Sequence, residues 1–285
     1  MKSNRTYSIN VRGRLFSLAR PVVMGIVNAT PDSFYAASRT QTEREIADRA
    51  RQIVEEGGQI IDIGGFSTRP DAQTVSVEEE LSRLEFAIQT VHREVPDVPI
   101  SVDTFRPDVA QRCIEEWGAD MVNDVGSIAM ASVTDADRDR KERMFTLVAR
   151  LGVPYILMSR ASTIEEIMLE LAADVNRLCE LGQKDIVLDP GFGFGKTQQQ
   201  NYDILNRMAL LTEFDFPLLV GLSRKSMLRL TPSPSDSEQL NATTALHMAA
   251  LERGANVLRV HDVAQAVQTV RLFEMLKTSE SIANE

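Results

Sequence analysis

The sequence predicts an α/β protein, a (β/α)₈ barrel of the TIM type with a short N-terminal β-hairpin. Eight short apolar runs lack polar alternation, which is typical of parallel strands buried on both faces. A helical pattern follows each run, as in repeated βαβ units, and eight such units favour closure over an open sheet. The length of 285 residues accommodates a barrel of this kind, which needs about 250. The runs are residues 22–28, 60–65, 100–103, 121–124, 155–159, 186–189, 218–223 and 257–261.

The helices between these runs have recognisable ends. Pro107 stands where a helix starts, a position at which its missing N–H costs nothing. Five helices are followed by glycine, which is favoured just beyond a helix C-terminus. These are Gly57, Gly118, Gly152, Gly182 and Gly254. The predicted helices are 43–56, 77–94, 107–117, 138–151, 164–181, 199–211, 238–253 and 263–276.

We expect one barrel domain at residues 21–278, with an N-terminal hairpin extension at 1–20 and a tail at 279–285. Alternating residues around Arg12-Gly13 predict the hairpin, which would plug the lower mouth of the barrel. The Pro- and Ser-rich stretch 231–237 follows the seventh strand. We interpret it as a loop on the rim and not as a domain boundary.

Composition excludes several classes of protein. The net charge of −10 argues against a nucleic-acid-binding surface and against binding to anionic membrane. No run reaches transmembrane length, and residues 1–14 do not resemble a secretory signal. Cys113 and Cys179 form no CxxC pair, which is typical of reduced thiols. We therefore expect a cytoplasmic protein whose substrates are small molecules.

Carboxylates end three of the runs, at Asp103, Asp124 and Asp189. The C-terminal ends of barrel strands share one rim, where active sites of this fold lie. A buried carboxylate needs donors or a cation; alternatively, Asp103 and Asp189 each cap the helix that follows. Two convergent carboxylates with Asn123 would suit a flat ligand with several N–H donors, such as a 2-amino-4-oxopyrimidine edge.

Cationic residues follow other strands of the same rim. Arg69, Lys225, Arg259 and His261 could together hold an anion, and a phosphate site near strands seven and eight recurs in this fold. A single Lys or Arg is usually a solvated surface charge. Arg259 differs because it lies inside an apolar run, where a charge needs a partner or ligand. Asn28, after the first strand, is either a ligand or a helix cap.

The glycine-rich stretch 189–197 reads Asp-Pro-Gly-Phe-Gly-Phe-Gly-Lys-Thr. Pro190 stands where a P-loop needs glycine, and the glycine spacing does not match a dinucleotide fingerprint. Three alternating glycines instead let the backbone pass close to a flat ligand. Phe192 or Phe194 would then form an apolar wall.

These motifs together resemble those of dihydropteroate synthases over residues 21–275. The first is Met24-Gly-Ile-Val-Asn-Ala-Thr-Pro-Asp-Ser-Phe34 and the second Ile61-Asp-Ile-Gly-Gly-Phe-Ser-Thr-Arg-Pro70. The rest match in order: Val102-Asp-Thr104, Val122-Asn-Asp124, residues 189–196, Ser223-Arg-Lys-Ser226 and Arg259-Val-His-Asp262.

The resemblance implies an enzyme that joins 6-hydroxymethyl-7,8-dihydropterin diphosphate to 4-aminobenzoate. Diphosphate is released through C–O cleavage to a pterin carbocation, with Mg²⁺ as cofactor, and the family suggests a homodimer. By matching position, the pterin residues are Asp103, Asn123, Asp189 and Lys225. The diphosphate residues are Asn28, Arg259 and His261, with Mg²⁺ at Asn28. The aminobenzoate residues are Thr68, Arg69, Pro70, Phe194, Lys225 and Ser226. Catalysis would fall to Asp103, Asp189, Lys225, Arg259 and His261.

The chain departs from the family pattern at three places. Phe66 replaces a usual Glu, residues 35–39 replace Ser-Asp-Gly-Gly, and Met158-Ser159-Arg160 replaces a His-Met ending. These changes motivate the alternative of a non-catalytic pterin-binding barrel. A second alternative is a pterin-dependent methyltransferase of the same superfamily. Against it, residues 67–70 and 223–226 suit an aminobenzoate and a diphosphate.

Overall fold

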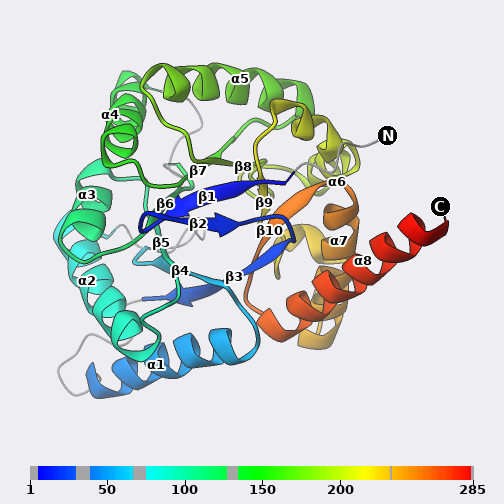
Figure 1. Cartoon of the computed structure of the whole chain (residues 1–285), viewed down its shortest axis with the longest axis horizontal. Coiled ribbons are helices and arrows are strands. Elements are labelled where there is room, and N and C mark those ends of the chain that lie inside the picture. Colours follow the sequence, from blue (N-terminus) through cyan, green and yellow to red (C-terminus); the bar gives the residue numbers. More distant parts are fainter. Residues whose placement is uncertain (1–5, 30–38, 67–74, 127–133, 232, 284–285) are drawn as a thin grey trace.

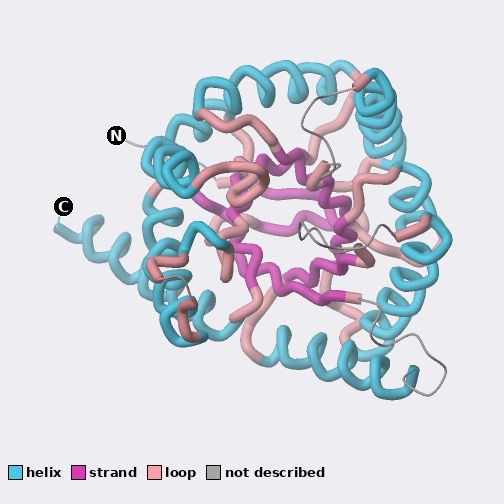
Figure 2. The backbone as a smooth tube through the Cα atoms, turned by 180° about the vertical axis from the view of Figure 1, so that it is seen from behind, coloured by secondary structure: helices cyan, strands magenta, loops and turns pink. Residues whose placement is uncertain are grey.

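Eight parallel strands close into a barrel in the order β10-β3-β4-β5-β6-β7-β8-β9. Helices surround the strands (Figure 1), and Figure 2 shows the same barrel from the opposite face. The computed structural model describes residues 6–29, 39–66, 75–126, 134–231 and 233–283. The strands are β3 Val22–Asn28, β4 Ile60–Gly64, β5 Ile100–Asp103, β6 Met121–Asp124, β7 Tyr155–Met158, β8 Ile186–Asp189, β9 Leu218–Val220 and β10 Ala255–Val260. The predicted (β/α)₈ barrel is confirmed.

Each predicted helix is present, with differences at the ends. The helices are α1 Arg39–Glu55, α2 Val77–Glu94, α3 Pro107–Glu115, α4 Asp135–Leu151, α5 Ile164–Glu180, α6 Gln198–Arg207, α7 Asp236–Glu252 and α8 Val263–Ala283. The chain tightens after α6 into the 3₁₀ helix η2, Met208–Phe214. The last helix, α8, continues through residues expected to form a tail. The predicted division into domains stays a prediction.

Local signals explain where these helices begin and end. Four helices start with a capping box, in which a Ser or Thr hydroxyl and the side chain three residues later each accept a backbone N–H. Their cap residues are Thr134, Thr163, Thr197 and Ser235. All five glycines predicted to follow helices have positive φ, a conformation that costs glycine little.

The N-terminal hairpin closes the lower mouth of the barrel, as predicted. Strands β1 (Ser8–Val11) and β2 (Arg14–Ser17) pair antiparallel, and Figure 1 shows them across the barrel centre. Ile9, Val11 and Leu18 are buried against the inward-facing residues at the start of the barrel strands. Those residues are Val22, Met24, Ile60, Met121, Ile156, Val187, Leu219 and Val257.

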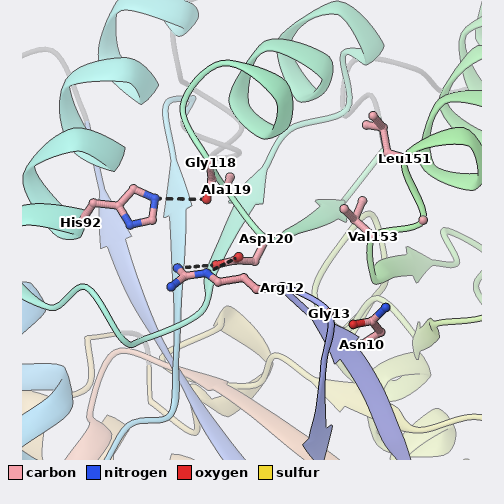
Figure 3. A pocket seen from close by; sticks show the side chains of 10 residues that line it. Asn10, Arg12, Gly13, His92, Gly118, Ala119, Asp120, Leu151 and Val153 are labelled. Atoms are coloured by element: carbon pink, nitrogen blue, oxygen red, sulfur yellow. Dashed lines mark hydrogen bonds and ion pairs between the residues drawn. The ribbon is translucent and has the colours of Figure 1, made fainter.

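The tip of the hairpin is anchored by a bidentate ion pair (Figure 3). Arg12 donates from Nε to Asp120 Oδ1 at 2.6 Å and from Nη2 to Oδ2 at 2.8 Å. Asp120 Oδ2 also accepts the backbone N–H of Ile100, the first residue of β5. The pair therefore ties the hairpin to the barrel beside a cavity of about 560 Å³, which Asn10, His92 and Val153 help to line.

This anchor predicts a loss of stability that is separate from activity. Replacing Asp120 by Ala leaves the Ile100 N–H without its side-chain acceptor and leaves Arg12 with only the carbonyls of Pro96 and Val98. A buried polar group left unpaired costs about 1–3 kcal/mol, so we expect urea denaturation to show a loss of about 2 kcal/mol in unfolding free energy. The control is Asp97→Ala, an exposed carboxylate nearby. Equal stability of the two variants would rule out this role for Asp120.

Candidate active site

Charged and polar side chains meet inside the barrel at the C-terminal ends of its strands. Asp103 ends β5 and faces Asn123 of β6 in the strand register. Asp189 ends β8. All three are buried, with exposed fractions of 9%, 1% and 5%. The structure therefore brings together the three acceptor residues that the sequence analysis assigned to one ligand.

Hydrogen bonds around Arg259 of β10 and Asp62 of β4 connect four strands across the interior, namely β10, β4, β5 and β6. Its Nε donates to Asp62 Oδ2 at 2.6 Å, and its Nη2 donates to Asp103 Oδ2 at 2.5 Å. Asn123 Nδ2 donates to the same Asp62 oxygen at 3.1 Å. Burial by itself lowers the pKa of Arg259, but the two carboxylates outweigh it and raise that pKa. The expectation that an inward Arg259 needs a partner is confirmed.

Asp62 is a site residue that the sequence analysis did not single out. It lies in the middle of β4, is fully buried and accepts from both Arg259 and Asn123. Its position inside an apolar run was the signal that could have identified Asp62, since a buried carboxylate, like the buried Arg259, needs a partner.

Two buried acceptors in this cluster have no hydrogen-bond partner among the described residues. They are Asp62 Oδ1 and Asn123 Oδ1. Buried polar atoms in folded proteins are nearly always paired, and an unmade hydrogen bond costs about 1–3 kcal/mol. Both oxygens lie beside Asp103 and Arg259, so the interior offers acceptors to a ligand that carries N–H donors.

The two carboxyl groups of the site are harder to ionise than usual. Burial raises the pKa of Asp103 to about 7, helped by the nearby Asp62, Glu80 and Asp124 and opposed by Arg259. Burial also raises the pKa of Asp189, against the effect of Lys225. A ligand that donates N–H groups or carries positive charge would favour the ionised form of both.

Neither Asp103 nor Asp189 caps the helix that follows it, so the alternative that they act as helix caps is wrong. The residue before α3 is Arg106 and the residue before α6 is Thr197. Asp189 Oδ1 instead accepts the backbone N–H of Gly191 at 2.7 Å. Residues 30–38, which follow Asn28, lie outside the described chain, so the helix-cap alternative for Asn28 is not tested.

Asp124 does not join the cluster. Its Oδ2 accepts the Tyr155 hydroxyl at 2.8 Å and its Oδ1 accepts the Gly126 N–H at 2.8 Å. Adjacent residues of a strand point to opposite faces, so Asn123 faces the interior and Asp124 faces the surrounding helices. Asp124, the third carboxylate at a strand end, therefore lies outside the cluster, and the sequence analysis had assigned it no ligand.

The glycine-rich loop after β8 passes close to other chain segments. A Cβ on Gly191 would lie 2.1 Å from the carbonyl oxygen of Ser159, and one on Gly193 would lie 2.7 Å from Lys225 Cδ. Both glycines also have positive φ. The loop therefore passes close to Ser159, just after β7, and to the Lys225 side chain, while the predicted approach to a flat ligand stays a prediction.

Lys225 lies against this loop on its inner side. Its Nζ donates to the carbonyl of Phe192 and lies 4.3 Å from the centroid of the Phe194 ring. Burial lowers the pKa of Lys225 to about 8, although Asp189 opposes the shift. Phe192 is fully buried, so Phe194 is the aromatic ring available to a ligand. Burial likewise lowers the pKa of Lys196, which donates to Gly191 O, to about 8.

Three further predicted residues lie on the exposed rim: Asn28, Ser226 and His261. The backbone N–H of His261 donates to Ser223 Oγ at 3.2 Å. The side chain of His261 is exposed. Desolvation by the neighbouring rim residues and, second, the positive charge of Arg259 nevertheless lower its pKa. The imidazole is therefore neutral near pH 7. Thr68, Arg69 and Pro70 lie outside the described residues.

The departures from the family pattern have structural explanations where they are described. Phe66 packs edge-to-face on Phe105, with ring centroids 6.0 Å apart. Ser159 donates from Oγ to Glu170 Oε2 at 2.5 Å. The ending of β7 is therefore tied to α5. Residues 35–38 lie outside the described part of the chain.

No helix in the described part of the chain has the length and apolar character needed to span a membrane. The described residues also contain no group of three or more His, Cys, Asp or Glu that could hold a metal ion by themselves.

Comparison with known proteins gives one consistent result. A family model described as pterin binding enzyme matches residues 24–261. The dihydropteroate synthase of Escherichia coli (strain K12) is 36% identical over 278 residues, which cover 92% of this chain and 94% of that protein. The dihydropteroate synthase of Synechocystis sp. is 37% identical over 263 residues and 90% of each chain.

Solved structures agree. The Xanthomonas albilineans dihydropteroate synthase with 4-aminobenzoic acid has a TM-score of 0.82 and 35% identity, covering 95% of this chain and 98% of that one. The same enzyme in complex with 7,8-dihydropteroate has a TM-score of 0.80 and 33% identity, covering 95% and 99%.

The raised pKa of Asp103 predicts a pH effect on stability. A carboxyl group whose pKa rises on folding stabilises the folded state below its ordinary value of 3.8, and this contribution is lost as pH rises toward about 7. Between about pH 5 and pH 7.5, the unfolding free energy of the wild type should therefore fall relative to Asp103→Asn, measured by urea denaturation. Asp203→Asn, an exposed control, should follow the wild type. Parallel slopes for wild type and Asp103→Asn would contradict the assignment.

Proposed function

The chain belongs to the dihydropteroate synthase family of transferases, and we propose that the residues at its barrel rim carry this family's reaction as follows. The reaction joins 6-hydroxymethyl-7,8-dihydropterin diphosphate to 4-aminobenzoate. It forms 7,8-dihydropteroate and releases diphosphate.

The pterin binds among Asp103, Asn123, Asp189 and Lys225. The observation that carries this assignment is the pair of unpartnered buried acceptors, Asp62 Oδ1 and Asn123 Oδ1. A pterin presents its 2-amino group and ring N–H groups along one edge, and these are the donors that such acceptors lack. Lys225 would donate to the pterin's own acceptors. Its lowered pKa, about 8, leaves it mostly protonated at pH 7.

The diphosphate binds at Asn28, Arg259 and His261, which offer one permanent positive charge and N–H donors. Arg259 brings a permanent charge, and the neutral His261 can donate one N–H. Mg²⁺ is usually held by one or two protein oxygens together with substrate phosphates. The exposed amide of Asn28 suits such a site, and the absence of a three-ligand cluster in the described chain is compatible with it. When bound, the ion would neutralise charge on the leaving diphosphate.

The residues act by stabilising charges that separate. The C–O bond breaks with its electron pair leaving on diphosphate, and the pterin keeps the positive charge. Asp103 and Asp189 favour this cation, while Arg259 and His261 favour the departing anion. The amine of 4-aminobenzoate is neutral at pH 7, so its lone pair forms the C–N bond without a general base. The amine proton is lost after the bond forms.

The second substrate is bound by the outer residues of the rim. Phe194 offers a ring face, and Lys225 and Ser226 lie beside it. We assign Thr68, Arg69 and Pro70 to the same substrate by their match to the family motif. A homodimer through α8 is part of the proposal. Its support is the exposure of Leu272, Met275 and Leu276 on that helix. Cytoplasmic location is also proposed, supported by two free cysteines.

The direct test is release of diphosphate from the pterin diphosphate. We expect release by the purified protein to require both 4-aminobenzoate and Mg²⁺, and 7,8-dihydropteroate to form in equal amount. The measurement is a coupled diphosphate assay with product identified by mass spectrometry. Tight pterin binding without any release dependent on 4-aminobenzoate would instead support the binding-only alternative.

Substitutions at the centre of the site should remove turnover without unfolding the chain. We expect Asp189→Asn and Lys225→Ala each to lower kcat by roughly a hundredfold, the scale for losing one preorganised electrostatic group. Far-UV circular dichroism should match the wild type. Lys184→Ala, at an exposed lysine, is the control. Near-native rates in either site variant would contradict the residue assignment.

A further inference from the structure

Two loops of the rim carry residues assigned to different ends of the same substrate. The loop after β9 holds Lys225, which we assign to the pterin. The turn after β10 holds His261, which we assign to the diphosphate. Each of these residues has a neighbour in the chain that the proposed reaction does not use, namely Arg224 and Asp262.

Arg224 and Asp262 join the two loops by a bidentate ion pair. The Nε of Arg224 donates to Asp262 Oδ2 at 2.9 Å, and its Nη2 donates to Oδ1 at 2.8 Å. Two parallel hydrogen bonds fix orientation as well as distance. The pair lowers the pKa of Asp262 and raises that of Arg224, so both groups stay charged through the neutral range.

The backbone at Arg224 is strained in a way that suits this role. Its φ is 56°, a left-handed conformation that is uncommon for residues other than glycine and is tolerated best by Asn, Asp and His. The Arg224 N–H donates to Thr243 Oγ1 at 3.2 Å, and Thr243 is buried on α7. Strain of this kind costs about 1–3 kcal/mol and persists where the surroundings hold it.

The turn after β10 is also held from its other side. Arg49 of α1 donates to the carbonyl of His261 at 2.5 Å and to that of Ile26 in β3 at 3.3 Å. Ser223 accepts the His261 N–H. His261 is thus connected to the loop that carries Lys225 on one side and to the strand that carries Asn28 on the other.

Stability alone does not account for the pair. The Arg224 side chain is 34% exposed and that of Asp262 is 17% exposed. Ion pairs with this degree of solvent contact contribute little to folding. Asp262 also compensates the charge of Arg224. Lys225 and Arg259 are therefore the cations that we assign to the substrate.

We propose that Arg224 is a positioning residue, whose ion pair with Asp262 fixes Lys225 relative to His261 and so aligns the pterin with its diphosphate. This inference rests on the proposed function. Arg224 touches neither substrate in this assignment. It acts through the residues on either side of the pair, and the reacting C–O bond lies between the two groups that it aligns.

The test uses Arg224→Asn and Asp262→Asn, each of which removes the ion pair from one side. Asn tolerates positive φ, so Arg224→Asn keeps the backbone while removing the guanidinium. Asp262→Asn leaves position 224 unchanged and serves if the first variant does not fold. We expect either to lower kcat/KM for the pterin diphosphate by about tenfold, since a displacement of about 1 Å can cost about a hundredfold. The melting temperature should change little.

A charge exchange and a matched control separate alignment from simple damage. The double variant Arg224→Asp with Asp262→Arg restores an ion pair of reversed polarity, and Asp also tolerates the backbone angle. We expect it to recover kcat/KM beyond either single variant. Arg229→Asn, at an exposed arginine of the same loop, should behave as wild type.

The outcomes are distinguishable from those that test the reaction itself. Wild-type kcat and KM in both single variants, with an active wild-type enzyme, would overturn the positioning role and leave the proposed function intact. A melting temperature that falls in proportion to kcat/KM, with no recovery in the double variant, would also overturn it. An inactive wild type would remove the proposed function, and the positioning role with it.

Discussion

The buried ion pairs of Arg259 connect β10 to β4 and β5 and set the electrostatics of the upper half of the barrel. A guanidinium inside a barrel is stable only if its charge is compensated, and Asp62 and Asp103 compensate it from β4 and β5. Burial in this cluster, with a smaller contribution from the nearby Asp62, raises the pKa of Asp103 to about 7 although Arg259 opposes it. Among the described residues, Asp62 Oδ1 and Asn123 Oδ1 have no donor.

The two faces of the barrel are held by different interactions. At the lower face, apolar side chains of the hairpin fill the interior, and Arg12 with Asp120 anchors the tip. At the upper face, the interior is polar and holds the buried groups Asp62, Asp103, Asn123 and Asp189. The free energy that folds the chain therefore comes mainly from apolar packing below and around the strands. The rim is consequently free to keep buried charges that reduce stability but suit the separation of a pterin cation from diphosphate.

The backbone conformation of the rim loops depends on the side chains and backbone atoms that contact them. Glycine is required at positions 191 and 193 because Ser159 and Lys225 lie where a Cβ would be. The loop after β9 instead accepts a strained arginine, because Arg224 is held by Asp262 from another part of the chain. These contacts place Lys225 against Phe194 and keep His261 at the opposite side of the site. The rim thus combines rigid backbone with side chains that keep their charges for a substrate.

The sequence by itself determined the barrel, the helix ends, the plugging hairpin and the polar residues that end the barrel strands. These features are encoded locally, in apolar runs, capping residues, glycines and motifs that short segments contain. The residues alone left open which of Phe192 and Phe194 is accessible, and they did not show that Asp62 pairs with Arg259 and Asn123. Those outcomes depend on strand register and on contacts between segments far apart in the chain. Arg259 meets Asp62 across 197 positions and Arg224 meets Asp262 across 38. The first contact needs closure of the barrel through β10 and β3, and the second needs the pairing of β9 with β10.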